Sequence, residues 1–318
     1  MKATNVIKDK GYRKRKAMDA LFYISFMIVP VTAFLLFYVY VNVDSLIMAF
    51  QKPKDGHLVS AGFENFKWLF EKLRTGGLAG GSDNIRIAFI NTFKTFGVQI
   101  VMFPIGLFVS YFIYKKILGY KAFRVIFYLP TIISGVVVSF FYLQLMQNGF
   151  MPKLLEKLYN LDYKLINPLV NSDFANKMVL LNLVWLTFPG QLIIWGGTFS
   201  RIPESVLESA RIDGVSWVRE MFGIILPLVW PTFVLMVTLQ IAGIFGSSGS
   251  VFLLTQGEYG TQTVSNWMYM QVYYATNPYA SRTLYYVAAM GLMLTAVSCI
   301  IAILVRKFLV SKIEETTY

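Results

Sequence analysis

The residue types that perform most acid–base, nucleophilic and metal chemistry are scarce in this chain. It has one histidine, His57, in a polar segment and one cysteine, Cys299, inside an apolar run. A single histidine excludes paired-histidine metal sites and histidine-based catalytic triads. The lone cysteine cannot form an intrachain disulfide, and we interpret it as a packed, inert thiol. A membrane-embedded enzyme would need a constellation that the apolar spans lack, since they hold no paired acids.

The sequence also lacks a nucleotide-binding loop. The pattern G-x-x-x-x-G-K-[ST] cradles phosphates with its backbone and its lysine. Gly190 and Gly196 are spaced suggestively, but Gly197 stands where the lysine is required. If ATP powers the activity of this chain, another polypeptide must hydrolyse it, and we expect no cofactor in the chain itself.

Polar and aromatic residues interrupt one long apolar stretch, residues 178–199. Pro189 and Gly190 fall near its middle and should loosen a helix there. Broken helices with polar groups near the bilayer midplane mark transport sites in other membrane proteins. Aromatic rings suit the apolar faces of sugars, and an amide can bond their hydroxyls. The candidate substrate-pathway residues are therefore Trp185, Phe188, Gln191 and Trp195; the alternative is that they pack against neighbouring helices.

Lys94 is the deepest charge in the predicted spans. An intramembrane charge is a candidate for function. If Lys94 faces a transport cavity, an acidic sugar becomes a plausible substrate. The alternative is that its long side chain reaches back to the outer membrane surface.

A short polar segment, residues 200–227, separates two of the apolar stretches and predicts two short helices. Pro203 suits a first helical position and Glu204 complements the positive end of the helix dipole. Gly214 suits a left-handed residue that ends the first helix, and Ser216 can cap a second helix running from Trp217 toward Pro227. Apolar residues flank unpaired acids in the first helix, namely Val206, Leu207 and Ala210 beside Glu204 and Glu208. That pattern fits either a surface that binds a partner or an amphipathic helix on the membrane.

The composition places these residues in a membrane protein. The 318 residues are 56% hydrophobic and only 14% charged, against about one-quarter charged in soluble domains. A helix needs about 20 apolar residues to cross the hydrocarbon core. Six stretches qualify, which predicts an all-α fold of six transmembrane helices: 20–42, 87–114, 123–146, 178–199, 222–246 and 284–306. The first is too long for the core of a cleaved signal peptide, and we interpret it as a retained helix.

Lysine and arginine orient these helices. With the N-terminus inside, the inner segments hold 17 such residues in 64 positions and the outer segments 11 in 112. The positive-inside rule therefore predicts cytoplasmic termini and explains the net charge of +12 without a nucleic-acid partner. The predicted organisation is a basic tail (1–19), the first helix (20–42), an outer loop (43–86), a membrane domain (87–306) and a cytoplasmic tail (307–318).

The cytoplasmic segment resembles the EAA loop of ABC importer permeases, whose pattern is E-A-A-x-x-D-G-A, a spacer, and then hydrophobic-x-L-P. The matching positions are Glu208, Ser209, Ala210, Asp213, Gly214, Leu226 and Pro227, with nineteen positions from Glu208 to Pro227. Ser209 and Val215 stand where alanine is usual, and Met221 where phenylalanine is usual. Further matches are the segments Gly62–Phe66, Asn91–Thr92, Phe123–Arg124 and Leu129–Pro130, and these are similar to permeases of the carbohydrate-uptake class.

This resemblance implies a type I ABC importer permease with no enzymatic activity of its own, in the cell membrane. The loop would couple the chain to a cytoplasmic ATPase that binds ATP and magnesium. Other implied partners are a second homologous permease, usually in a heterodimer, a second ATP-binding subunit and an extracellular solute-binding protein. The implied cargo is a carbohydrate, in particular an oligosaccharide. The alternatives are an importer for a non-sugar solute and a secondary transporter driven by an ion gradient, although the spans show neither an internal repeat nor a carboxylate.

Overall fold

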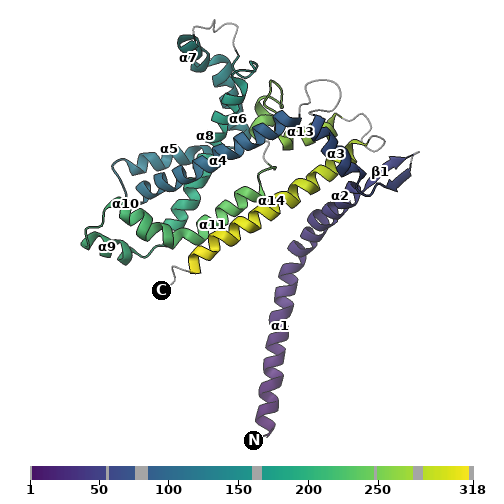
Figure 1. Cartoon of the computed structure of the whole chain (residues 1–318). Helices are drawn as coiled ribbons and strands as arrows, with labels where there is room; N and C mark the ends of the chain where they lie inside the picture. The colour runs from purple at the N-terminus through teal and green to yellow at the C-terminus, as the bar shows by residue number, and fades with distance from the viewer. Residues whose placement is uncertain are drawn as a thin grey trace. The chain divides into compact units, whose positions relative to one another are not determined.

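The computed structural model describes residues 2–54, 57–75, 85–159, 167–246, 249–274 and 282–314. The chain divides into two compact units, residues 1–67 with 277–292, and residues 68–276 with 293–318. The described parts are helical apart from one two-stranded sheet, which confirms the predicted class (Figure 1). Among these described residues, five helices are long and apolar enough to cross a membrane, and a sharply bent helix pair makes a sixth crossing if it is one span.

The first unit contains a long apolar helix run. It consists of α1 (Lys2–Phe34), the π-helical turn η1 (Leu35–Tyr40) and α2 (Val41–Ala49). Residues Lys14–Ala49 form the candidate span, which extends the predicted 20–42 at both ends. Nearly all of its side chains are exposed within this chain, so other molecules, lipid above all, must cover them.

The predicted outer loop, residues 43–86, is more structured than its sequence indicated. It contains the end of α2, the antiparallel hairpin of β1 (Gln51–Lys54) and β2 (His57–Ser60), and α3 (Glu64–Thr75). Asn65 Nδ2 donates hydrogen bonds to the carbonyl oxygens of Ala49 (2.9 Å) and Gln51 (2.8 Å), which satisfies the end of α2. The glycine-rich part, residues 76–84, lies outside the described residues.

Glu64 forms two exposed ion pairs that link separate segments of the first unit. Its carboxylate accepts hydrogen bonds from Lys52 Nζ and from Arg282 Nη2, and these two cations hold the pKa of Glu64 below its ordinary value. The pair interactions therefore contribute above the unfolded-state pKa and are lost as the pH falls through the lowered, folded-state pKa. The β-hairpin, the start of α3 and residue 282 thus stay linked at neutral pH.

The second unit is built around two helices that pack along each other, α4 (Ile85–Tyr114) and α8 (Ala175–Phe199) (Figure 1). They approach closely at Gly106, where a Cβ would lie 2.7 Å from Gln191 Oε1 and 3.1 Å from Gln191 Cβ. Small residues allow such approach between membrane helices, where close van der Waals packing drives association.

The third predicted span, 123–146, was wrong as a single helix. The segment forms α5 (Tyr120–Ile132) and α6 (Gly135–Asn148), which meet at 104°. Ile133 and Ser134 adopt extended backbone conformations between them, and Pro130 lies in the last turn of α5, where it weakens helix continuation. Tyr128 of α5 donates to Leu192 O (3.4 Å) and Tyr142 of α6 to Met178 O (2.7 Å), so both arms of the bend bond to α8.

The remaining elements complete the second unit and carry the chain to its end. They are α7 (Phe150–Tyr159), α9 (Glu204–Ile212), α10 (Trp217–Glu220), the π-helical turn η3 (Met221–Ile225), α11 (Leu226–Ala242), α12 (Gly249–Leu254), α13 (Val264–Tyr273) and α14 (Thr283–Glu314). The fifth predicted span was 222–246, but the helical run extends from Trp217 to Ala242, so its start was misplaced. Trp230 Nε1 donates to Leu309 O (3.0 Å) and links α11 to the end of α14.

The contact at Gly106 yields a stability prediction. Gly106→Val should destabilise the chain by about 1–3 kcal/mol, because the added atoms overpack the interface with Gln191. Gly97→Val is the matched control, since Gly97 lies in the same helix and a Cβ there meets nothing within 4 Å. Thermal unfolding in detergent should show a lower midpoint for Gly106→Val alone, and equal midpoints for the two variants would contradict this account of the interface.

Candidate functional site

The segment between α8 and α10 forms a compact helical corner. Helix α9 ends in a Schellman motif, in which Gly214 N donates to Arg211 O (3.1 Å) and Val215 N donates to Ala210 O (3.0 Å). Gly214 has a φ of +65°, the left-handed conformation predicted for it. Pro203 precedes the first helical residue and does not occupy it, while Ser216 is the N-cap of α10 without a side-chain capping bond. The chain thus reverses sharply at Gly214.

The apolar side of α9 faces the chain's own core. Leu207 and Ala210 are buried, so the prediction that they form an exposed apolar patch was wrong. The outward surface of the corner is polar with one apolar side chain at its tip, Ile212, which is 86% exposed. Its other exposed members include Glu204, Glu208, Ser209, Arg211, Asp213 and Gly214.

Four of the residues that match the EAA-loop pattern also have local structural roles. Ser209 Oγ donates to Ser205 O (2.9 Å), and Asp213 is the C-cap of α9. Leu226 begins α11 and packs against the core, and Pro227 follows it at the junction with the π-helical turn η3. The π-helical turn η3 precedes them, so the second helix of the loop runs without a gap into the membrane-spanning helix.

A hydrophobic cluster connects this corner to three membrane-spanning helices. Its buried members are Phe103, Leu107, Tyr111, Trp195, Phe199, Ile202, Leu207, Met221, Ile225 and Val229. They come from α4, α8, α9, η3 and α11 and the turn before α9. Close-packed protein interiors transmit strain, so this cluster is a physical connection between α9 and the ends of these helices.

A buried ion pair joins the same elements. Lys115 Nζ, just beyond α4, donates to both carboxylate oxygens of Glu220 at 2.8 Å, and the Glu220 side chain is 4% exposed. The ammonium also lies 6.0 Å from the ring centroid of Tyr111. This pair was not predicted from the sequence, which carries little signal for it, because the exposed Arg219 directly precedes Glu220.

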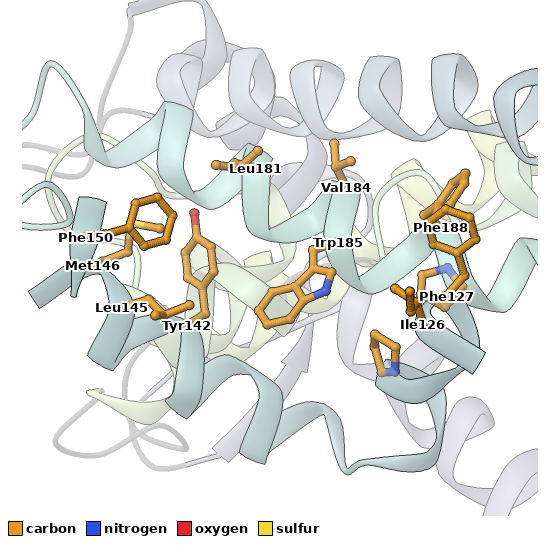
Figure 2. Close-up of a pocket in the computed structure, with 12 residues that line it drawn as sticks. Ile126, Phe127, Tyr142, Leu145, Met146, Phe150, Leu181, Val184, Trp185 and Phe188 are labelled. Carbon is orange, nitrogen blue, oxygen red and sulfur yellow. The ribbon is translucent and has the colours of Figure 1, made fainter. Parts of the chain in front are cut away.

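Two of the predicted substrate-pathway residues share an apolar pocket. Figure 2 shows Trp185 and Phe188 of α8 with Phe127 of α5 and Tyr142 of α6. The cavity measures about 460 Å³ and has only apolar and aromatic side chains, the hydroxyl of Tyr142 being bonded to Met178 O. The pocket thus offers ring faces and few hydrogen-bonding groups.

The other three predicted substrate-pathway residues lie elsewhere. Gln191 is buried against Gly106, and its Oε1 has no hydrogen-bond partner among the described residues. Trp195 is fully buried, with its ring 5.2 Å from that of Phe103 between centroids. Lys94 is exposed on α4 and lines neither of the pockets described here.

A second polar network, also missed, lies at the opposite end of α4. Asn91 Nδ2 donates to Gly260 O (2.7 Å) and Gln262 O (3.0 Å), while Asn176 of α8 donates to Asn91 Oδ1. Thr92 Oγ1 accepts from Val264 N at 2.9 Å. The loop before α13 is therefore bonded to α4, and the same Asn91 links α4 to α8.

The backbone arrangement has counterparts among solved structures. The chain is similar to a protein in a bacterial ABC transporter involved in the import of the acidic polysaccharide alginate, with a TM-score of 0.69 and 20% identity over 96% of this chain and 100% of the other. This likeness establishes the type I importer permease fold.

Sequence comparison identifies the family. Residues 102–315 match the family described as the binding-protein-dependent transport system inner membrane component, and the chain belongs to it. It is similar to the arabinooligosaccharides transport system permease protein AraP of Bacillus subtilis, with 24% identity over 94% of this chain and 92% of AraP. It is also 26% identical to the maltose/maltodextrin transport system permease protein MalF of Vibrio vulnificus over 64% of this chain, but it spans only 38% of MalF.

The ion pair yields a prediction about stability. Lys115→Met should lower the free energy of unfolding in detergent by about 3 kcal/mol, because it leaves a buried carboxylate unpaired. Glu220→Gln should cost less, about 1 kcal/mol, because the remaining ammonium keeps access to water.

Two further variants serve as controls. Lys116→Met removes an exposed neighbouring charge and should change stability little. The double variant Lys115→Met/Glu220→Leu should recover most of the loss, because no buried charge is left alone. If Lys115→Met and Lys116→Met unfold alike, the pair does not hold the corner.

Proposed function

We propose that this chain is a permease subunit of an ATP-driven importer that moves a carbohydrate, in particular an oligosaccharide, across the cell membrane. The observation that carries the proposal is the helical corner at Gly214, exposed on one side and packed into the helix core on the other. Membership in the inner-membrane family and the sugar-related names of the relatives support this function.

The exposed side of the corner is the proposed docking surface for an ATPase. Glu208, Ser209, Asp213 and Gly214 present a polar surface, and Ile212 adds an apolar anchor. The ATPase would supply the ATP and magnesium chemistry, and this chain would have no catalytic role. A second homologous permease, a second ATP-binding subunit and an extracellular solute-binding protein complete the proposed importer.

The proposed mechanism is mechanical. Closure of the ATPase subunits would displace α9 as a rigid element. Leu207 and Ala210 would pass that displacement into the hydrophobic cluster, and the Lys115–Glu220 pair would pass it to the end of α4. The helices around the translocation path would then change their arrangement together.

The proposed substrate-pathway residues fall into two groups with different surroundings. Trp185 and Phe188 have exposed ring surface in one pocket and fit a stacking role. Gln191 and Trp195 lie in the α4–α8 packing, and their proposed effect on substrate is indirect, through helix position. Lys94 would act at the outer end of α4 in the proposed topology.

The topology itself is testable. With both termini cytoplasmic, a cysteine at Glu208 should react with a membrane-impermeant thiol reagent only in inside-out vesicles. The background carries Cys299→Ala, so that the engineered cysteine is the sole thiol. Labelling in right-side-out vesicles would overturn the proposed orientation and the docking role with it.

The backbone requirement at Gly214 tests the docking role directly. Gly214→Pro cannot adopt a φ of +65° and removes the N–H that bonds to Arg211 O, so it should reduce ATP-dependent uptake by roughly a hundredfold, which corresponds to a cost of about 3 kcal/mol. Gly214→Asn should retain most uptake, because asparagine tolerates the left-handed conformation. Uptake and co-purification of the ATPase should fall together in Gly214→Pro, with the subunit still in the membrane. Normal uptake by that variant would refute the docking role.

A further inference from the structure

A polar pocket lies between the start of α4, the loop before α13 and the end of α13. Its volume is about 510 Å³, comparable to small-molecule sites in general. The residues that line it are Ile87, Gln256, Gly257, Glu258, Tyr259, Gly260, Gln262, Met270 and Tyr274. In the proposed topology this is the outer end of α4, where a delivered solute would arrive.

The lining chemistry differs from that of the apolar pocket in Figure 2. Gln256 and Gln262 offer amide donors and acceptors, Glu258 offers a carboxylate, and Tyr259 and Tyr274 offer partly exposed rings. Rings that present an apolar face and a polar tip suit the alternating C–H and hydroxyl surfaces of a sugar. Of the described lining residues, none is a lysine or arginine, and Glu258 is the one charged group.

The loop that supplies most of this lining is held in a defined shape. Asn91 bonds to the carbonyl oxygens of Gly260 and Gln262, and the hydroxyls of Thr255 and Thr261 lie 2.6 Å apart. Gly257 has a φ of +91°, and a Cβ there would overlap Asn266 Oδ1. A loop fixed in this way loses little conformational entropy when a ligand binds, which favours recognition.

We propose that this pocket binds a neutral saccharide unit and disfavours acidic sugars. Glu258 accepts hydrogen bonds from sugar hydroxyls but repels a uronic-acid carboxylate, and no lining cation compensates for that repulsion. This specificity rests on the proposed sugar-import function. It narrows the proposed substrates to neutral saccharides, whereas a transporter of the same fold is involved in the import of an acidic polysaccharide. Lys94, the residue that would favour an acidic substrate, does not line the pocket.

The test measures saccharide binding to the intact importer complex in lipid nanodiscs, without the binding protein, by saturation-transfer NMR. The neutral probes are maltotriose and arabinotriose, and the acidic probe is trigalacturonate. The neutral probes should give ring-proton signals and the acidic probe none. Tyr274→Ala should weaken the neutral signals roughly three- to tenfold, and Glu258→Lys should admit the acidic probe.

Two control variants separate the pocket from its surroundings. Phe140→Ala removes a similarly exposed ring on α6 that does not line the pocket, and Asp173→Asn removes an exposed acid elsewhere in the same unit. Both should bind the neutral probes as the unaltered chain does. Equal signals from trigalacturonate in the unaltered complex, or signals that are insensitive to both Tyr274→Ala and Glu258→Lys, would overturn the proposal.

ATP-dependent uptake in proteoliposomes with the binding protein tests the import function separately from the pocket. Uptake of a neutral oligosaccharide without binding at this pocket would refute the pocket and leave the proposed function standing. A complex that transports no saccharide of either charge would refute the proposed function, and the pocket's specificity with it.

Discussion

The buried contact between Lys115 and Glu220 is the constraint on which the helical corner of this protein depends. A carboxylate that is 4% exposed is costly without a partner, so α10 cannot leave the end of α4 while the pair exists. The surrounding cluster adds apolar contacts from α8, α9 and α11 to the same place. The polar corner is therefore part of the helix bundle and not an independent appendage.

The opposite end of α4 is fastened by a different kind of bond. There, amide and hydroxyl groups of Asn91 and Thr92 bond to backbone atoms of the loop before α13. A single helix thus has a charged attachment at one end and neutral hydrogen bonds at the other, with Gly106 in close contact with α8 between them. Because both attachments are short and directional, a rigid shift of α4 alters the two ends together.

The sequence predicted the elements whose signal is local and missed those that depend on contacts between distant residues. The apolar stretches located the spans, and Gly214 was correctly assigned a left-handed conformation because few other residues adopt it without strain. The break at Ile133–Ser134 was missed, because hydropathy averages over a window and does not register a change of direction. Glu220 and Lys115 are 105 positions apart, and neither residue type indicates by itself that it is buried.

In the candidate site, too, the sequence predicted the local features and missed the contacts between distant segments. The motif located the corner, but periodicity could not decide which side of α9 the protein itself would cover, and Leu207 faces inward. The sequence did not distinguish the four candidate substrate-pathway residues of α8 from one another. In the structure, Trp185 and Phe188 face α5 and α6. Gln191 and Trp195 face α4. Asn65 and Asn91 had been noted only as motif letters, yet each bonds to backbone carbonyls of another segment.

The bend between α5 and α6 restricts what can surround this subunit. Ile133 and Ser134 are extended and exposed within the chain, and although Ser134 O accepts from Val138 N, the i to i−4 bonding of a continuous helix is interrupted there. Hydrocarbon tolerates such backbone only where protein or water covers it. Where this bend lies within the hydrocarbon layer, it must therefore border either a neighbouring subunit or an aqueous passage, and lipid is excluded from it.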